Sequence, residues 1–225
     1  MLHNKSEYNS FSRDFMEDSV KTNGVQTGTT TVGLVCKDGV VLASDRRATM
    51  GYLIASKDID KIYPVSDRIA MTIAGGVGDA QTLIRWMTAE LKLYELKHEK
   101  PATVEAAATL LANILAQYKY YPFFVQLLIG GIDERPRLFS VDMLGGITEE
   151  KYTSTGSGSP VAYGVLEELF TEERDITVNL PVAAKAVSAA MKRDAASGER
   201  VDLCVVTKFG FKRMEKEDVS RLLGG

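Results

Sequence analysis

The sequence predicts an α+β fold, a four-layer αββα sandwich in which two antiparallel sheets stack face to face between two pairs of helices. The elements run in the order strands, two helices, strands, two helices and strand, which differs from the regular alternation of a doubly wound parallel sheet. Tight-turn signals join the short strands into hairpins. A chain of 225 residues is long enough to bury such a core without disulfides.

The first half of the chain contains two strand pairs followed by two helices. Runs of β-branched residues flank the Asp38-Gly39 hairpin signal. Two later segments, separated by Pro101, carry apolar residues at helical spacing. We expect strands at 31–36, 40–44, 61–65 and 68–74, and helices over about 79–97 and 103–119.

The second half again runs from strands to helices and ends in a strand. A nearly continuous apolar run is typical of a strand buried on both faces, and Pro160 in a tight turn is typical of a helix start. Small apolar residues on one face mark the last long helix. We expect strands at 123–130, 138–142, 147–153 and 202–207, helices at 161–170 and about 181–196, and a solvated tail after residue 212.

The composition excludes several classes of protein. Lysine and arginine number 27 against 30 acidic residues, and the net charge of −3 gives no support to nucleic-acid or polybasic membrane binding. No apolar run approaches the roughly 18 residues of a membrane span, and the N-terminal region lacks the apolar core of a signal peptide. Cys36 and Cys204 lie in apolar stretches, which predicts buried thiols in a reducing compartment such as the cytoplasm.

Histidine is scarce, which limits the possible catalytic chemistry. His3 lies in a polar leader and His98 ends a charged helix, and the sequence has no other histidine. Neither fits a Ser-His-Asp or Cys-His centre, and the chain offers no ligand set for structural zinc. Acid–base chemistry would therefore come from carboxylates, lysines, hydroxyls or a chain terminus.

A chain terminus would serve if the chain were cut before Thr29. On its own, the Gly28-Thr29-Thr30-Thr31 stretch is ordinary for the start of a strand. After a cut, the α-amine of Thr29, with a pKa near 7.7–8.0, would be partly neutral and could activate the hydroxyl of the same residue.

Charged residues elsewhere have both a structural and a functional interpretation. Asp45 at a strand end is commonly solvated, and Lys61 beside a buried strand commonly extends its ammonium to water. If they instead met near Thr29, the fixed cation would lower the pKa of the hydroxyl and favour the neutral amine. Asp194 is expected near a helix C-terminus, where the helix dipole favours cations rather than a carboxylate. This conflict favours a functional role for Asp194.

Two glycine-rich segments lie at expected helix starts. The stretch from Ala74 to Asp79 could cradle a phosphate, but it lacks the Gly-Lys-Ser/Thr sequence of a nucleotide loop. Its backbone N–H groups could instead stabilise an oxyanion. The stretch from Gly156 to Ser159 is commonly a turn and could place a hydroxyl at a site.

Taken together, these motifs resemble a β-type subunit of the proteasome 20S core particle, of the archaeal kind. The resemblance covers essentially everything from Thr29 onward. The motifs that carry it, in order, are Thr29-Thr30-Thr31-Val32-Gly33, Asp45-Arg46-Arg47, Lys61, Ala74-Gly75-Gly76, Gly156-Ser157-Gly158-Ser159 and Arg193-Asp194-Ala195-Ala196-Ser197-Gly198.

The resemblance implies an N-terminal nucleophile hydrolase with residues 1–28 as a removable pro-segment and 29–225 as the catalytic αββα domain. It implies a cut between Gly28 and Thr29, with Thr29 as a threonine-protease nucleophile. Many family members have a glutamate where this chain has the shorter Asp45. The other implied roles are charge partners at Asp45 and Lys61, orientation of the amine by Ser157, Asp194 and Ser197, an oxyanion donor at Gly75, support from Arg47, and a substrate pocket formed by Ala48, Thr49, Ile59, Ile73 and Val77.

The resemblance also implies partners. It predicts rings of seven β-type subunits, capped by α-type subunits, with an unfolding ATPase that delivers unfolded polypeptides. An apolar pocket predicts cleavage after large apolar residues. No metal, organic cofactor, nucleic acid or membrane is implied. Three alternatives stay open: a non-catalytic subunit of the same architecture, an amidase acting on a small molecule, and a nucleotide-binding module.

Overall fold

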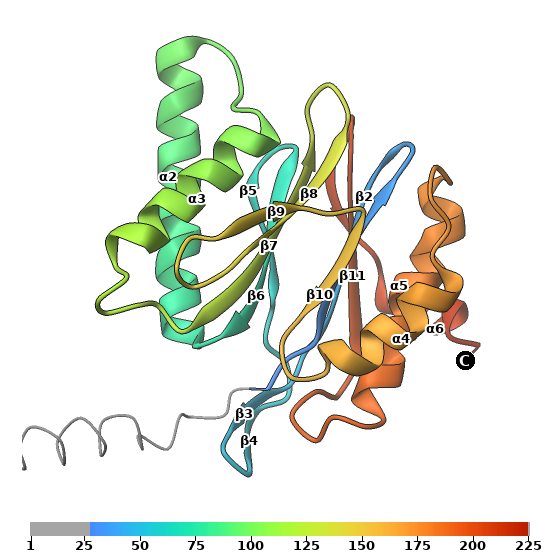
Figure 1. Ribbon diagram of the computed structural model, residues 1–225. Coiled ribbons are helices and arrows are strands. Elements are labelled where there is room, and N and C mark those ends of the chain that lie inside the picture. The colour runs from blue at the N-terminus through green and yellow to red at the C-terminus, as the bar shows by residue number, and fades with distance from the viewer. Residues whose placement is uncertain (1–27, 225) are drawn as a thin grey trace, which may run out of the picture.

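The computed structural model, which describes residues 28–224, confirms the four-layer sandwich (Figure 1). Two five-stranded antiparallel sheets lie face to face, with α2 (Val77–His98) and α3 (Val104–Gln117) outside one of them. The outer face of the other sheet is covered by α4 (Ser159–Leu169), α5 (Ile176–Met191) and the short α6 (Lys216–Leu222).

The first sheet has the strand order β10-β1-β2-β11-β12, and the second has β5-β6-β7-β8-β9. The first consists of β10 (Tyr152–Thr155), β1 (Thr31–Cys36), β2 (Gly39–Asp45), β11 (Val201–Thr207) and β12 (Gly210–Arg213). The second consists of β5 (Ile62–Ser66), β6 (Ile69–Gly75), β7 (Val125–Ile132), β8 (Pro136–Val141) and β9 (Ile147–Glu149). A separate hairpin of β3 (Ala48–Met50) and β4 (Leu53–Ser56) projects at one end of the sandwich (Figure 1).

The core consists of three apolar layers, one between the sheets and one under each set of helices. Val40 and Leu42 of β2 meet Leu128 of β7 and Leu138 of β8 between the sheets. Cys36 and Cys204 are buried, as expected. Burial of these alternating strand faces aligns the two sheets, and so brings the strand ends that carry the motifs to one end of the sandwich.

Three sequence predictions were wrong in detail. The expected strand at 147–153 is two strands, because β9 pairs with β8 in one sheet and β10 with β1 in the other. The fourth long helix begins at Ile176 rather than Pro181, because the carboxylate of Asp38 caps its first N–H at 2.7 Å from a distant part of the chain. It ends at Met191, so Asp194 lies beyond it.

The predicted solvated tail was also wrong. After β12 the chain forms α6, whose Val219 is buried in the layer under α4 and α5. The β3–β4 hairpin and β12 were not expected. Of the predicted pro-segment, only Gly28 is among the described residues. Within residues 28–224, no helix has both the length and the apolar character required to cross a membrane.

Candidate active site

The predicted site residues lie at one end of the sandwich, although they come from distant parts of the sequence. Thr29 precedes β1, Asp45 ends β2, Lys61 precedes β5 and Gly75 ends β6. Ser157 lies between β10 and α4, and the loop from α5 to β11 carries Asp194 and Ser197. Figure 1 shows these strand ends and loops meeting at the end of the molecule where the β3–β4 hairpin projects. The antiparallel pairing of β1 with β2 and β10 brings them together.

Thr29 is buried, and its hydroxyl lies beside the peptide bond that precedes it. Its Oγ1 donates to the carbonyl oxygen of Gly28 at 2.6 Å, and its backbone N–H donates to Ser157 Oγ at 3.2 Å. On the other side of the linkage, the N–H of Gly28 donates to Thr49 Oγ1 at 2.9 Å. The Gly28-Thr29 bond is therefore held from both sides, with a hydroxyl next to its carbonyl.

Asp45 and Lys61 form a buried ion pair, with Nζ and Oδ1 2.8 Å apart. The shorter aspartate therefore reaches the lysine directly. Asp45 is fully buried and also accepts from the backbone N–H groups of Thr30, Arg47 and Gly198 at 2.9–3.0 Å. Burial lowers the pKa of the Lys61 ammonium, and the neighbouring Asp45 carboxylate opposes that shift.

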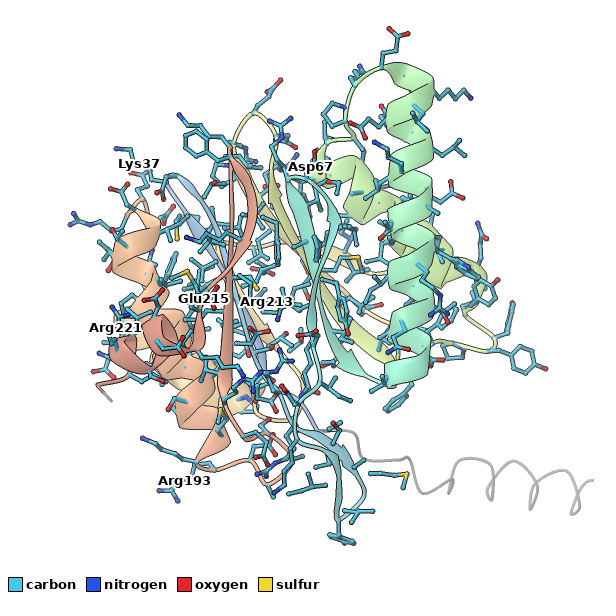
Figure 2. The ribbon with its side chains drawn as sticks, turned by 180° about the vertical axis from the view of Figure 1, so that it is seen from behind. Lys37, Asp67, Arg193, Arg213, Glu215 and Arg221 are labelled. Atoms are coloured by element: carbon cyan, nitrogen blue, oxygen red, sulfur yellow. The ribbon has the colours of Figure 1, made fainter. Side chains whose placement is uncertain are left out.

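A second carboxylate connects to the nitrogen of Thr29. Asp194 Oδ2 accepts from Ser157 Oγ and from Ser197 Oγ, each at 2.6 Å, and Oδ1 accepts from the N–H of Ala196 at 3.1 Å. Because the Ser157 proton faces Asp194, a lone pair of Ser157 is free to accept from the Thr29 nitrogen. The neighbouring Arg193 instead points outward from the molecule (Figure 2).

Arg47 supports the loop that carries Asp194. Its backbone N–H bonds to Asp45, and its guanidinium donates to the carbonyl oxygen of Ala195 at 3.0 Å and to Glu199 at 3.2 Å. The side chain thus spans from the end of β2 to the loop between α5 and β11.

The sequence analysis missed a charged network beside Lys61. Arg46 bonds to Asp60 and to Asp202, and Arg213 of β12 bonds to the same two carboxylates. Arg213 also donates to the carbonyl oxygen of Ile62 at 2.8 Å. The network therefore clamps the residues on both sides of Lys61. Arg46 and Asp60 are next to residues of the predicted site in the sequence, but no local pattern indicates that Arg213 of β12 reaches Asp60.

A small pocket opens beside Thr29 and Lys61. The five expected pocket residues all line it, together with Gly28 and Gly75. Gly75 has a φ of +119°, and a Cβ there would lie 2.1 Å from the carbonyl oxygen of Phe124, so only glycine fits. The Lys61 ammonium in the lining is paired with Asp45. The other lining side chains are mainly apolar: Ala48, Ile59, Ile73 and Val77, with Thr49.

Possible metal ligands among the described residues are the histidine, cysteine, aspartate and glutamate side chains. Over residues 28–224, no group of three or more histidine, cysteine, aspartate or glutamate side chains is arranged to hold a metal ion. The carboxylates of the site are instead occupied by lysine, hydroxyl and backbone N–H donors.

Comparison with known proteins gives a consistent result. A family model described as Proteasome subunit matches residues 25–206. The chain is 53% identical to the proteasome subunit beta of Archaeoglobus profundus, over 88% of this chain and 94% of that protein. It is 52% identical to the one from Methanocaldococcus vulcanius, over 88% and 90%, and 50% identical to the one from Methanosarcina thermophila, over 85% and 92%. The chain belongs to the proteasome subunit family.

Proposed function

We propose that this chain is a threonine-type endopeptidase, the β subunit of a proteasome core particle, and that it is made as a zymogen. One observation carries the proposal: the Thr29 hydroxyl lies 2.6 Å from the Gly28 carbonyl oxygen, in a pocket that it shares with Lys61. The relatives are named proteasome subunit beta, which supports the assignment of this chain to the β type.

Activation is proposed to be self-cleavage at Gly28-Thr29. Thr29 Oγ1 attacks the Gly28 carbonyl carbon, the C–N bond breaks, and the nitrogen takes up the hydroxyl proton. The acyl group is then an ester on Oγ1. Water hydrolyses this ester, which releases residues 1–28 with a new carboxylate and leaves Thr29 with a free amine and a free hydroxyl.

The free amine then supplies the base that the chain lacks elsewhere. It takes the proton of Oγ1 as the hydroxyl attacks a substrate carbonyl, and it returns that proton to the leaving amine as the peptide C–N bond breaks. The substrate acyl group is then an ester on Oγ1, and water hydrolyses this ester to release the second product and restore the hydroxyl. Lys61, held by Asp45, stabilises the developing negative charge on Oγ1. Ser157 accepts one N–H of the amine, so that its lone pair is turned toward Oγ1. The Gly75 N–H is proposed to hold the oxyanion, a contact commonly worth about 3–4 kcal/mol.

The pocket supports cleavage after large apolar residues. Among residues 28–224 the lining side chains are mainly apolar, and the Lys61 ammonium in the lining is paired with Asp45, which gives an acidic side chain little to bind. Fluorogenic peptides with acidic, basic and apolar residues before the cut test this preference, and faster cleavage of basic peptides would reject it.

Assembly follows the family pattern in this proposal. Seven copies form a ring, two rings stack between rings of α-type subunits, and an unfolding ATPase delivers polypeptides. Cytoplasmic location fits an intracellular protease whose sites are enclosed. Gel filtration separates this function from a small-molecule amidase, because only the protease requires a very large particle.

The decisive test is intact-mass analysis of the chain co-expressed with its α-type partner. The wild-type chain is expected to lose residues 1–28, and Thr29→Ala is expected to keep them while folding normally. Cleavage between residues 28 and 29 in Thr29→Ala would defeat the proposal, because the proposed nucleophile is the Thr29 hydroxyl that lies beside that carbonyl.

A further inference from the structure

We propose that Thr30, the residue after the nucleophile, is a positioning residue for the reaction: its side-chain hydroxyl holds Ser197 and, through it, Asp194 and Ser157 in place against the Thr29 nitrogen. This inference rests on the proposed function. The juxtaposition that carries it is a distance of 2.7 Å between Thr30 Oγ1 and Ser197 Oγ, with both side chains fully buried.

The direction of the hydrogen bonds follows from the chemistry of the groups. An ionised carboxylate only accepts, so Ser157 and Ser197 both give their protons to Asp194. Ser197 then has no proton left for Thr30 and must accept from it. The hydroxyl chain therefore runs from Thr30 to Ser197 to Asp194, and Ser157 joins Asp194 to the nitrogen of Thr29.

The two ends of this hydroxyl chain differ in how firmly they are held. Ser157 is exposed and Asp194 is partly exposed, and both lie in loops. Thr30 is fixed to the sheet, because its N–H donates to Asp45 Oδ1 at 2.9 Å and its carbonyl oxygen accepts from the N–H of Asp45 at 3.2 Å. The buried end thus anchors the exposed end that touches the reacting residue.

Thr30 also connects the Asp45–Lys61 ion pair with the group formed by Asp194, Ser157 and Ser197. Its backbone N–H meets the same Asp45 oxygen that receives the Lys61 ammonium, and its hydroxyl meets the Asp194 half. Without that hydroxyl, Ser197 keeps a buried lone pair with no donor, which costs free energy. Ser197 can recover a partner only by moving, and Asp194 and Ser157 would move with it.

The loop keeps other attachments when the hydroxyl is removed. Gly198 still donates to Asp45 at 3.0 Å, and the Arg47 guanidinium still donates to Ala195. A variant at residue 30 is therefore expected to fold, with the loss concentrated in the turnover step rather than in binding of substrate.

The test compares Thr30→Ser with Thr30→Ala in the assembled core particle, because these variants differ by one oxygen atom. Thr30→Ala and Thr30→Val are expected to lower kcat about tenfold, with KM unchanged, while Thr30→Ser keeps most of the wild-type kcat. Thr153→Val is the matched control, since Thr153 is also a buried threonine but the partner of its hydroxyl, at 2.9 Å, is Tyr163 rather than a residue of the site. It is expected to leave kcat unchanged.

Two outcomes would overturn the inference. If the wild-type particle hydrolyses peptides and Thr30→Ala has the kcat of Thr30→Ser, the hydroxyl does not position the site, although the proposed function stands. If Thr30→Ala and Thr153→Val lower kcat equally, the effect is general loss of packing. A fully assembled wild-type particle without peptidase activity would instead overturn the proposed function, and the inference with it.

Discussion

Gly28→Ala gives a prediction that separates self-cleavage from the activity of the mature enzyme. A Cβ on residue 28 would lie 1.6 Å from Ala196 Cβ, and 2.6 and 2.8 Å from the Cα and carbonyl carbon of Ala196. Carbon atoms in contact are about 3.5–4.0 Å apart, so residue 28 would have to move by about 2 Å. Ala196 cannot yield freely, because its N–H is bonded to Asp194.

Such a movement would carry the Gly28 carbonyl away from the Thr29 hydroxyl. A misplacement of about 1 Å in a reacting pair can cost about 100-fold in rate, so we expect self-cleavage of Gly28→Ala to slow by at least about 100-fold. The assay is a time course of intact mass during assembly with the α-type partner. Subunits that do lose the leader are chemically identical to the wild type, so activity per cleaved subunit should be unchanged.

Gly164→Ala is the matched control for this experiment. It is the same chemical change, but a Cβ at residue 164 in α4 meets nothing within 4 Å. It is expected to cleave at the wild-type rate. Wild-type cleavage kinetics in Gly28→Ala would refute the steric reasoning, and would show that the Gly28-Thr29 linkage reacts in a different arrangement from the one described.

Three further predictions concern stability and reactivity. Lys61→Met leaves the buried Asp45 carboxylate without its cation and should lower the free energy of unfolding, measured by urea denaturation, by about 3 kcal/mol. Adding Asp45→Asn should restore part of that stability, and a Lys61→Met variant as stable as the double variant would contradict this. Burial raises the pKa of Cys36 and Cys204 from 9.0 to about 12. The stability that comes from keeping these thiols protonated is therefore complete below pH 9 and is lost as the pH rises through about 12. Dithiobis-nitrobenzoate at about pH 8 should label both thiols only after unfolding, and rapid labelling of the native protein would contradict their burial. Gly164→Ala should raise the free energy of unfolding by about 0.5–1 kcal/mol, and a lower urea midpoint would be the opposite result.

Local patterns in the sequence were enough to predict the type and order of most elements. Strand and helix periodicities depend on neighbouring residues, and they correctly indicated α2, α3 and most strands of the stacked sheets. They failed where a distant partner decides the outcome. The start of α5 depends on Asp38, far away in the sequence, and the split between β9 and β10 depends on which sheet supplies the neighbouring strand.

The candidate site divides in the same way. The scarcity of histidine and the Gly28-Thr29 junction pointed to a chain terminus as the base, and the family motifs supplied the candidate residues around it. Their roles stay predictions, but their proximity is a property of the fold: Thr29 meets Ser157 across 128 positions, and Thr30 meets Ser197 across 167.

The amino-acid sequence by itself determined which chemical groups are available. These are Thr29 after a glycine, Lys61, the carboxylates of Asp45 and Asp194, and two histidines in the whole chain. Only the tertiary structure decided which of these groups face one another, because the pairing of β1 with β2 and β10 closes long loops that no local pattern records. The physical reason is that side-chain periodicity is a short-range property, whereas hydrogen bonds at a buried site depend on the register of strands that are far apart in the chain.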